Sequence, residues 1–158
     1  MTCEYARRKW IISGFSAGAV APDLSGVRDD HAVAIQQCDG VQWDLSSVVP
    51  QCAALSVCES SNVGLVLGVV SGAVELVRCN GVQLQCDSNA VQVDGCRRVT
   101  LFVRPERCES TQVRSSSSSE VEISVPVDEF TDPRVYALPT QFVTAFRDGQ
   151  WHTSAVKM

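Results

Sequence analysis

Long apolar segments and aromatic side chains are both scarce in this chain of 158 residues, of which only 6% are aromatic. The longest uninterrupted apolar stretch is residues 63–70, far short of the roughly 20 residues that a membrane-spanning helix needs. The basic residues near the N-terminus are not followed by the apolar run of a secretory signal. We therefore expect a cytoplasmic protein that has no membrane as a partner.

Histidine and basic charge are also in short supply, which limits the chemistry open to the chain. His31 and His152 are the only histidines, neither belongs to a recognisable catalytic motif, and both are expected at surface or boundary positions. Residues 64–72 have the glycines of a phosphate-binding loop without its Lys-Ser or Lys-Thr, so these glycines are expected to mark turns. The net charge of −5 and the pI near 4.9 disfavour a nucleic-acid partner. The sequence predicts a non-enzyme without a cofactor.

Helical periodicity is missing as well. No segment keeps apolar residues at i, i+3, i+4 and i+7, whereas Val, Ile and Thr recur at alternate positions over residues 32–125. Even residues 48–57, the segment most open to a helical interpretation, contain Pro50 and several β-branched side chains. The chain is therefore expected to be mostly β.

Cysteine, in contrast, is abundant: the chain has eight, with no Cys-x-x-Cys pair among them. A cytoplasmic location keeps thiols reduced and the missing pairs argue against zinc, so free thiols and no metal are expected. Cys38, Cys58, Cys79 and Cys96 each precede a few polar or small residues and then an alternating apolar strand, at steps of about 20 residues. Such a repeat is typical of a solenoid.

Two solenoids have repeats of this length, the leucine-rich repeat and the parallel β-helix, and the use of Val with only an occasional Leu favours the β-helix. Cys79 and Cys96 are then expected to stack in the core at equivalent turns of successive coils, with Cys86 at an inward strand position. Strand alternation predicts the other orientations: Val91, Val93, Val99, Leu101 and Val103 inward, and Arg98, Thr100, Phe102 and Arg104 outward.

The segments after the repeats differ in character. The run Ser115–Ser119 is expected to form a flexible surface turn, with a phosphorylation target as the other interpretation. The strand that follows alternates, with Val121, Ile123 and Val125 on one face and Glu120, Glu122 and Ser124 on the other. Residues 126–139 contain three prolines and predict an irregular, extended crossing segment.

The C-terminal residues 141–158 predict a β-hairpin around Asp148-Gly149, a dipeptide that suits a type I′ turn. An isolated hairpin is marginally stable in water, so its apolar side chains need a surface to cover them. That surface is either the end of the solenoid or a second chain. The predicted organisation is one domain, with a β-helix at 1–140 and a hairpin at 141–158.

Nearly the whole chain resembles the C-terminal domain of cyclase-associated protein, an actin-monomer regulator. The resemblance is carried by Arg7–Trp10, by the "DGC" at Asp94–Cys96, by the Ser-Ser-Glu step at Ser118–Glu120, and by "P-x-Q-F-x-T" at 139–144. It implies a right-handed parallel β-helix of five to six coils whose hairpin is exchanged between two subunits of a homodimer. The chain is either an excised domain or a short form consisting of this domain alone, and Met1 favours the short form.

The resemblance also implies a function: binding of monomeric actin, preferably with ADP, and promotion of nucleotide exchange. The candidate actin-binding residues are outward residues of the later coils and the tail, namely Arg98, Thr100, Phe102, Arg104, Glu120, Glu122, Lys157 and Met158. The candidate dimerisation residues are Phe142, Phe146, Trp151 and Val156. Where the family has Pro-x-Pro-Glu-Gln-Phe, this chain has Ala137 and Thr140, so a contact through that glutamate is expected to be missing.

Two other functions compete with actin binding. Tubulin-folding cofactor C has a similar β-helix and acts on a GTPase through an inserted arginine; its Gln-x-x-x-Arg arrangement is not evident here, so Arg97, Arg98 or Arg104 would have to serve. A carbohydrate-active β-helix would need clustered outward carboxylates. The coils over residues 32–108 carry too few aligned acids for that.

Overall fold

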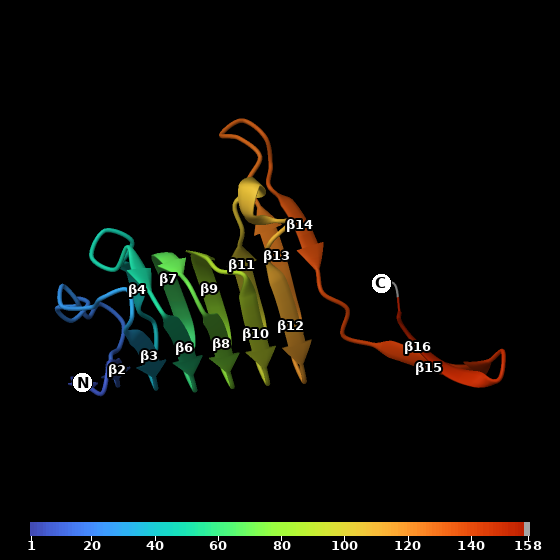
Figure 1. Ribbon diagram of the computed structural model, residues 1–158, viewed down its shortest axis with the longest axis horizontal. Helices are drawn as coiled ribbons and strands as arrows, with labels where there is room; N and C mark the ends of the chain where they lie inside the picture. Colours follow the sequence, from blue (N-terminus) through green and yellow to red (C-terminus); the bar gives the residue numbers. More distant parts are fainter. Residues whose placement is uncertain (157–158) are drawn as a thin grey trace.

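The computed structural model describes residues 1–156, so the candidate residues Lys157 and Met158 lie outside the described part of the chain. The described part forms a parallel β-solenoid of about five turns, and a C-terminal hairpin projects beyond its last coil (Figure 1). The prediction of an almost helix-free chain is confirmed, because the one helical segment in residues 1–156 is the 3₁₀ turn η1 (Pro105–Arg107). None of the described helices is long and apolar enough to cross a membrane.

Seven strands form one side of the solenoid, which we call the first sheet. Their hydrogen-bonded order is β1 (Thr2–Ala6), β2 (Lys9–Ser13), β3 (Ala32–Gln36), β6 (Ala54–Cys58), β8 (Ala73–Val77), β10 (Ala90–Asp94) and β12 (Gln112–Ser116). All neighbours are parallel except β1, which is antiparallel to β2. Each coil thus adds one strand to this sheet, as the repeat predicts.

The second sheet lies on the other side of the coils. Its order is β4 (Gln42–Asp44), β7 (Ser61–Val70), β9 (Asn80–Asp87), β11 (Arg97–Phe102), β13 (Ser119–Val125) and β14 (Arg134–Ala137), with the short β5 (Gln51–Cys52) also paired to β7. Strand β14 is antiparallel to β13. The prediction that 126–139 is irregular throughout was therefore wrong, because residues 134–137 satisfy the open hydrogen-bonding edge of β13.

The core lies between the two sheets and consists of stacked rows of aliphatic side chains. In the first sheet, Val33, Leu55, Val74 and Val91 align across successive strands and are at most 7% exposed. Each such burial contributes about 1.5–3 kcal/mol. The inward predictions are confirmed, because Val91, Val93, Val99, Leu101 and Val103 are all buried. Cys86 is half-buried and packs against the same core.

A ladder of small polar side chains forms one corner of the solenoid. Its members each donate a hydrogen bond to the carbonyl oxygen two residues earlier: Cys38, Ser60, Cys79, Cys96 and Ser118. The stacking of Cys79 on Cys96 is confirmed, since the Cys79 N–H donates to the Cys96 sulfur at 3.4 Å. All eight cysteines are free. The alignment of Cys58 with Cys38, Cys79 and Cys96 at the head of a repeat unit was wrong: Cys58 ends β6, and Ser60 takes the corner position, where its hydroxyl makes the same bond.

Three further expectations were wrong. Gly64 and Gly68 lie inside β7 and not at turns. Glycine is needed there because the Gln42 amide and the Pro50 carbonyl occupy the space of a Cβ. Ser124, expected on the outer face of a half-exposed strand, is 4% exposed and lies beside Phe102 in the neighbouring strand. His31, expected at the surface or boundary, is 7% exposed, because two aromatic side chains pack around it. Of the Ser115–Ser119 run, only Ser117 and Ser118 lie between strands, with Ser117 at a φ of 50°; Ser115 and Ser116 end β12 and Ser119 begins β13.

The C-terminal hairpin is confirmed, with β15 (Phe142–Arg147) antiparallel to β16 (Gln150–Ala155). Asp148 and Gly149 have φ values of 53° and 79°, as a type I′ turn requires. Figure 1 shows the hairpin extending away from the solenoid. Phe142, Phe146 and Trp151 are 62%, 57% and 70% exposed, so the solenoid of the same chain does not cover them.

Candidate functional site

The outer face of the second sheet carries a groove made of two adjoining hollows. Two cross-strand rows of residues form its floor: Gln42, Gly64, Gln83, Thr100 and Glu122 in one, and Asp44, Val66, Gln85, Phe102 and Ser124 in the other. The hollows have volumes of about 410 Å³ and 280 Å³. Gly64 has no side chain, and the Gln42 amide occupies the space that a Cβ there would need.

The strands of this sheet begin with residues in an unusual backbone conformation. The residues Asn62, Gly81, Arg98 and Glu120 occupy the same corner of successive coils and have φ values of 52°, 82°, 60° and 54°. Glycine adopts this left-handed conformation freely, whereas other L-residues are held there at a cost of about 1–2 kcal/mol. The stacked coils thus hold Arg98 and Glu120 at the rim of the groove.

The larger hollow is polar, and its charges are partly paired. The Arg98 Nε donates to Asn80 Oδ1 at 3.0 Å, and the Thr100 hydroxyl donates to Glu122 Oε1 at 3.2 Å. Glu120 lies 3.5 Å from the guanidinium of Arg97. Each carboxylate therefore keeps an oxygen free to accept hydrogen bonds from a partner.

The smaller hollow is more apolar. Phe102 is half-buried and lies there with Trp43, Val66 and Gln85 along its lining. The exposed aromatic residue expected at 102 is thus partly packed against the sheet. An aromatic side chain beside hydrogen-bonding groups suits the centre of a protein interface.

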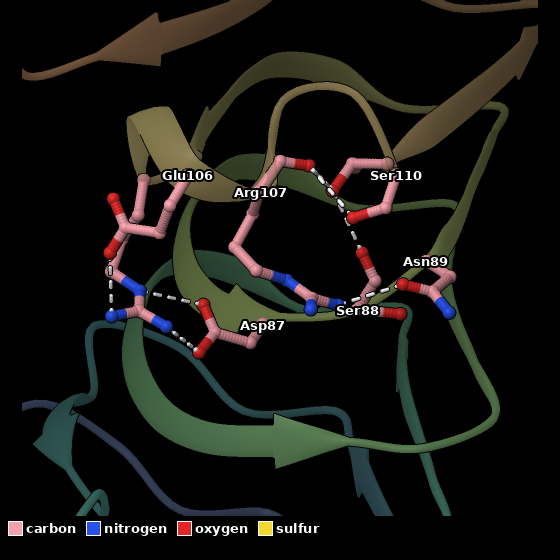
Figure 2. Close-up of polar contacts among 8 residues, drawn as sticks. Asp87, Ser88, Asn89, Glu106, Arg107 and Ser110 are labelled. Atoms are coloured by element: carbon pink, nitrogen blue, oxygen red, sulfur yellow. Dashed lines mark hydrogen bonds and ion pairs between the residues drawn. The ribbon is translucent and has the colours of Figure 1, made fainter.

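Arg104, predicted to share this face, lines neither hollow. It follows the end of β11, and its Nε donates to Asp87 Oδ1 at 2.9 Å while Nη1 lies 2.9 Å from Glu106 (Figure 2). Asp87 raises the pKa of the Arg104 guanidinium through this paired contact. In the same network Arg107 Nη2 donates to Asn89 Oδ1 at 2.7 Å. Arg104 lies beyond β11, which ends at Phe102, and just before η1. Its bond to Asp87 therefore joins η1 to the preceding coil.

The structure thus brings together five of the predicted residues: Arg98, Thr100, Phe102, Glu120 and Glu122. It also adds residues that sequence reasoning missed, namely Gln42, Asn62, Gln83 and Gln85. The signal that could have found them is register. Once the coils are aligned on the corner ladder, Gln83 falls beside Thr100 and Gln85 beside Phe102.

The comparisons with known proteins agree with this fold. Residues 1–158 match the family model described as adenylate cyclase associated (CAP) C terminal. The chain belongs to this family. It is 31% identical over 105 residues to Cyclase-associated protein 1 of Arabidopsis thaliana, a match that covers 65% of this chain. The match spans only 22% of that relative's length.

A solved structure supports the family fold over almost the full chain. The crystal structure of Cyclase-associated protein from Cryptosporidium parvum superimposes with a TM-score of 0.80 at 18% identity. The match covers 98% of this chain and 94% of that one. The prediction of a cyclase-associated protein C-terminal β-helix is therefore confirmed.

Proposed function

We propose that this domain acts in the cytoplasm and binds monomeric actin, preferably with ADP, through the groove on the second sheet. In this proposal, binding promotes exchange of the nucleotide on actin. The family match over the whole chain is the observation that carries the proposal. The groove supports the choice of surface, since it combines a half-buried aromatic residue, Phe102, with the charged groups of Arg98, Glu120 and Glu122. Lys157 and Met158 stay candidates for a tail contact.

The proposed mechanism needs no chemical step by this chain. A binding protein shifts a conformational equilibrium only by its differential affinity for the two states. Promotion of exchange therefore requires the groove to hold the open, nucleotide-releasing state of actin more tightly than the closed state. The charges at the groove rim would set orientation, and Phe102 would supply buried apolar contact.

We also propose that the domain acts as a homodimer formed by exchange of the hairpin. Phe142, Phe146, Trp151 and Val156 are exposed in the single chain, and a two-stranded hairpin is marginally stable alone. A dimer would present two grooves, which raises avidity wherever two actin subunits lie within reach.

The test is the release of a fluorescent nucleotide from ADP-actin. Gln83→Arg places a long cation in the groove, and Gln92→Arg is a matched control, because Gln92 is equally exposed at the middle of β10 in the first sheet. We expect the wild-type protein and Gln92→Arg to accelerate release and Gln83→Arg to lose at least about tenfold in apparent affinity. No binding and no acceleration at about 50 μM wild-type protein would refute the proposal.

The GTPase alternative gains no support from the arginines it would use. Arg97 is paired with Glu120, Arg98 with Asn80, and Arg104 with Asp87. An inserted arginine has to be free to enter a partner's nucleotide site. We therefore propose only the actin-directed function.

A further inference from the structure

His31 is a buried titratable side chain to which the proposed function assigns no role. It precedes β3 at the N-terminal end of the solenoid and is 7% exposed. The rings of Tyr5 and Trp10 surround it, with centroids 5.1 Å and 6.5 Å from the imidazole. This cluster lies in the first sheet and its adjoining loop, away from the groove.

The hydrogen bonds of His31 fix its protonation state. The Nδ1 atom accepts from the indole Nε1 of Trp10 at 3.1 Å and from the backbone N–H of Arg28 at 3.1 Å. Both groups are donors only, so Nδ1 carries no proton and the neutral ring carries its proton on Nε2. Nε2 in turn faces the Tyr5 hydroxyl at 3.4 Å and Asp30 Oδ1 at 3.7 Å.

Protonation of this imidazole would act on both bonds at once. A proton on Nδ1 removes the lone pair that accepts from Trp10 and Arg28, and it places three N–H groups at one point. Buried donors left without an acceptor are unfavourable, so the arrangement has to open. Asp29 and Asp30 favour the cation, whereas Arg8 and Arg28, which line the same cleft of about 780 Å³, oppose it.

The two bonds to Nδ1 join Trp10 of β2 to the turn at residues 28–31. Strand β1 does not depend on them, because all five of its residues are paired with β2 and the Tyr5 hydroxyl faces Nε2. The turn itself is closed by the His31 N–H to the Arg28 carbonyl at 3.0 Å and by the imidazole. Such a turn is a local structure of the kind that opens independently of a core.

We propose that His31 is a pH-sensitive latch, which in its neutral form ties the 28–31 turn to Trp10 of β2 and on protonation releases that turn. The latch opens when the ring gains its second proton, because the cation cannot accept the two bonds.

The test is hydrogen-exchange NMR on the full chain at pH 7.5 and pH 5.0, with rates expressed as protection factors. The Trp43 indole, which donates to the Ala19 carbonyl at 3.1 Å, is an internal control without a histidine partner. We expect the protection of the Trp10 indole and the Arg28 amide to fall at least about tenfold at pH 5.0, together with titration of the His31 ring, while Trp43 stays protected.

Two variants isolate the latch. His31→Gln removes the titration and keeps an acceptor, so its Trp10 protection should not respond to pH, and His152→Gln should behave as wild type because His152 is exposed. Unchanged protection of Trp10 and Arg28 at pH 5.0, an equal loss at Trp43, or an unaltered pH response in His31→Gln would each overturn the proposal. If His31→Gln does not fold, the wild-type comparison of Trp10 with Trp43 decides the question alone.

Discussion

The backbone N–H of Cys79 donates a hydrogen bond to the sulfur of Cys96 in the next coil, at 3.4 Å. The single S–H of each thiol is shared between the carbonyl two residues earlier and a carbonyl of the preceding coil, that of Val57 for Cys79 at 3.2 Å and that of Leu76 for Cys96 at 3.3 Å. The contact with Cys96 and burial raise the pKa of the Cys79 thiol, which keeps it a protonated donor at neutral pH. The cysteines therefore act as small hydrogen-bonding residues of a corner.

This role predicts that serine can replace cysteine in the ladder and alanine cannot. Cys96→Ser retains a donor and an acceptor, as Ser60 and Ser118 do at equivalent corners, and should change the free energy of unfolding by less than about 1 kcal/mol. Cys96→Ala leaves the buried Cys79 N–H without an acceptor and should cost about 1–3 kcal/mol. Urea unfolding measures both. Equal stability of the two variants would show that the bond contributes nothing.

A second prediction concerns alkaline pH. Burial raises the pKa of the Cys52 thiol from 9.0 to about 11, so the folded chain keeps this thiol neutral where the unfolded chain ionises it. The resulting stabilisation is complete below pH 9 and is lost as the pH rises toward 11. At pH 10.5 wild type should lose about 2 kcal/mol relative to Cys52→Ala, each compared with its own value at pH 8. Parallel pH curves for the two proteins would contradict this.

The architecture could be predicted from sequence because a solenoid repeats its information. Alternating Val positions recur from coil to coil and cysteine recurs at three of the five corners, so a unit that is ambiguous alone can be aligned on its neighbours. The cysteine pattern misaligns one unit, because it selects Cys58 where Ser60 makes the equivalent hydrogen bond. A hydroxyl and a thiol of similar size are interchangeable there, and pattern matching on cysteine alone could not recognise it.

The parts that sequence could not give depend on contacts between coils. Arg98 and Glu120 adopt positive φ because the stacked coils impose it, although neither residue favours that conformation. His31 is buried because Tyr5 of β1 and Trp10 of β2 pack around it. The floor of the groove depends on the register between strands, which places Gln83 beside Thr100. Local propensity carries none of this information.

The two glycines inside β7 should respond differently to substitution. A Cβ at Gly64 would meet Gln42 Oε1 at 2.0 Å, the mobile end of a side chain that can swing away. A Cβ at Gly68 would meet the Pro50 carbonyl oxygen at 2.1 Å, which is fixed backbone. Gly68→Ala should therefore destabilise by about 1–3 kcal/mol or more, and Gly64→Ala by less than about 1 kcal/mol. Thermal unfolding compares the pair, and a greater loss in Gly64→Ala would contradict the packing argument.

The pairing of Arg104 with Asp87 predicts a modest, local effect. Removal of either partner should free η1, because Arg104 joins it to the end of β9. The Arg104 side chain is 47% exposed, so Asp87→Asn should cost no more than about 1 kcal/mol in global stability. Amide exchange over residues 104–111 should nevertheless rise, and a double-mutant cycle with Arg104→Gln isolates the pair. A coupling energy of zero would mean that Arg107 and Asn89 hold this turn alone.

The hairpin should control the oligomeric state. The rings of Phe146 and Trp151 pack edge to face, with their centroids 5.2 Å apart, and both side chains are exposed. Together they form one apolar surface that a second subunit could bury. Phe146→Ser with Trp151→Ser should convert a dimer into a monomer in sedimentation velocity, because interface aromatic residues contribute several kcal/mol when they are buried. Thr144→Ser with Thr153→Ser is the matched control, since it keeps the cross-strand hydroxyl pair of 3.0 Å within the same hairpin. A wild-type protein that sediments as a monomer at about 100 μM would refute the exchanged dimer, and it would leave the actin-binding groove to be tested as a single site.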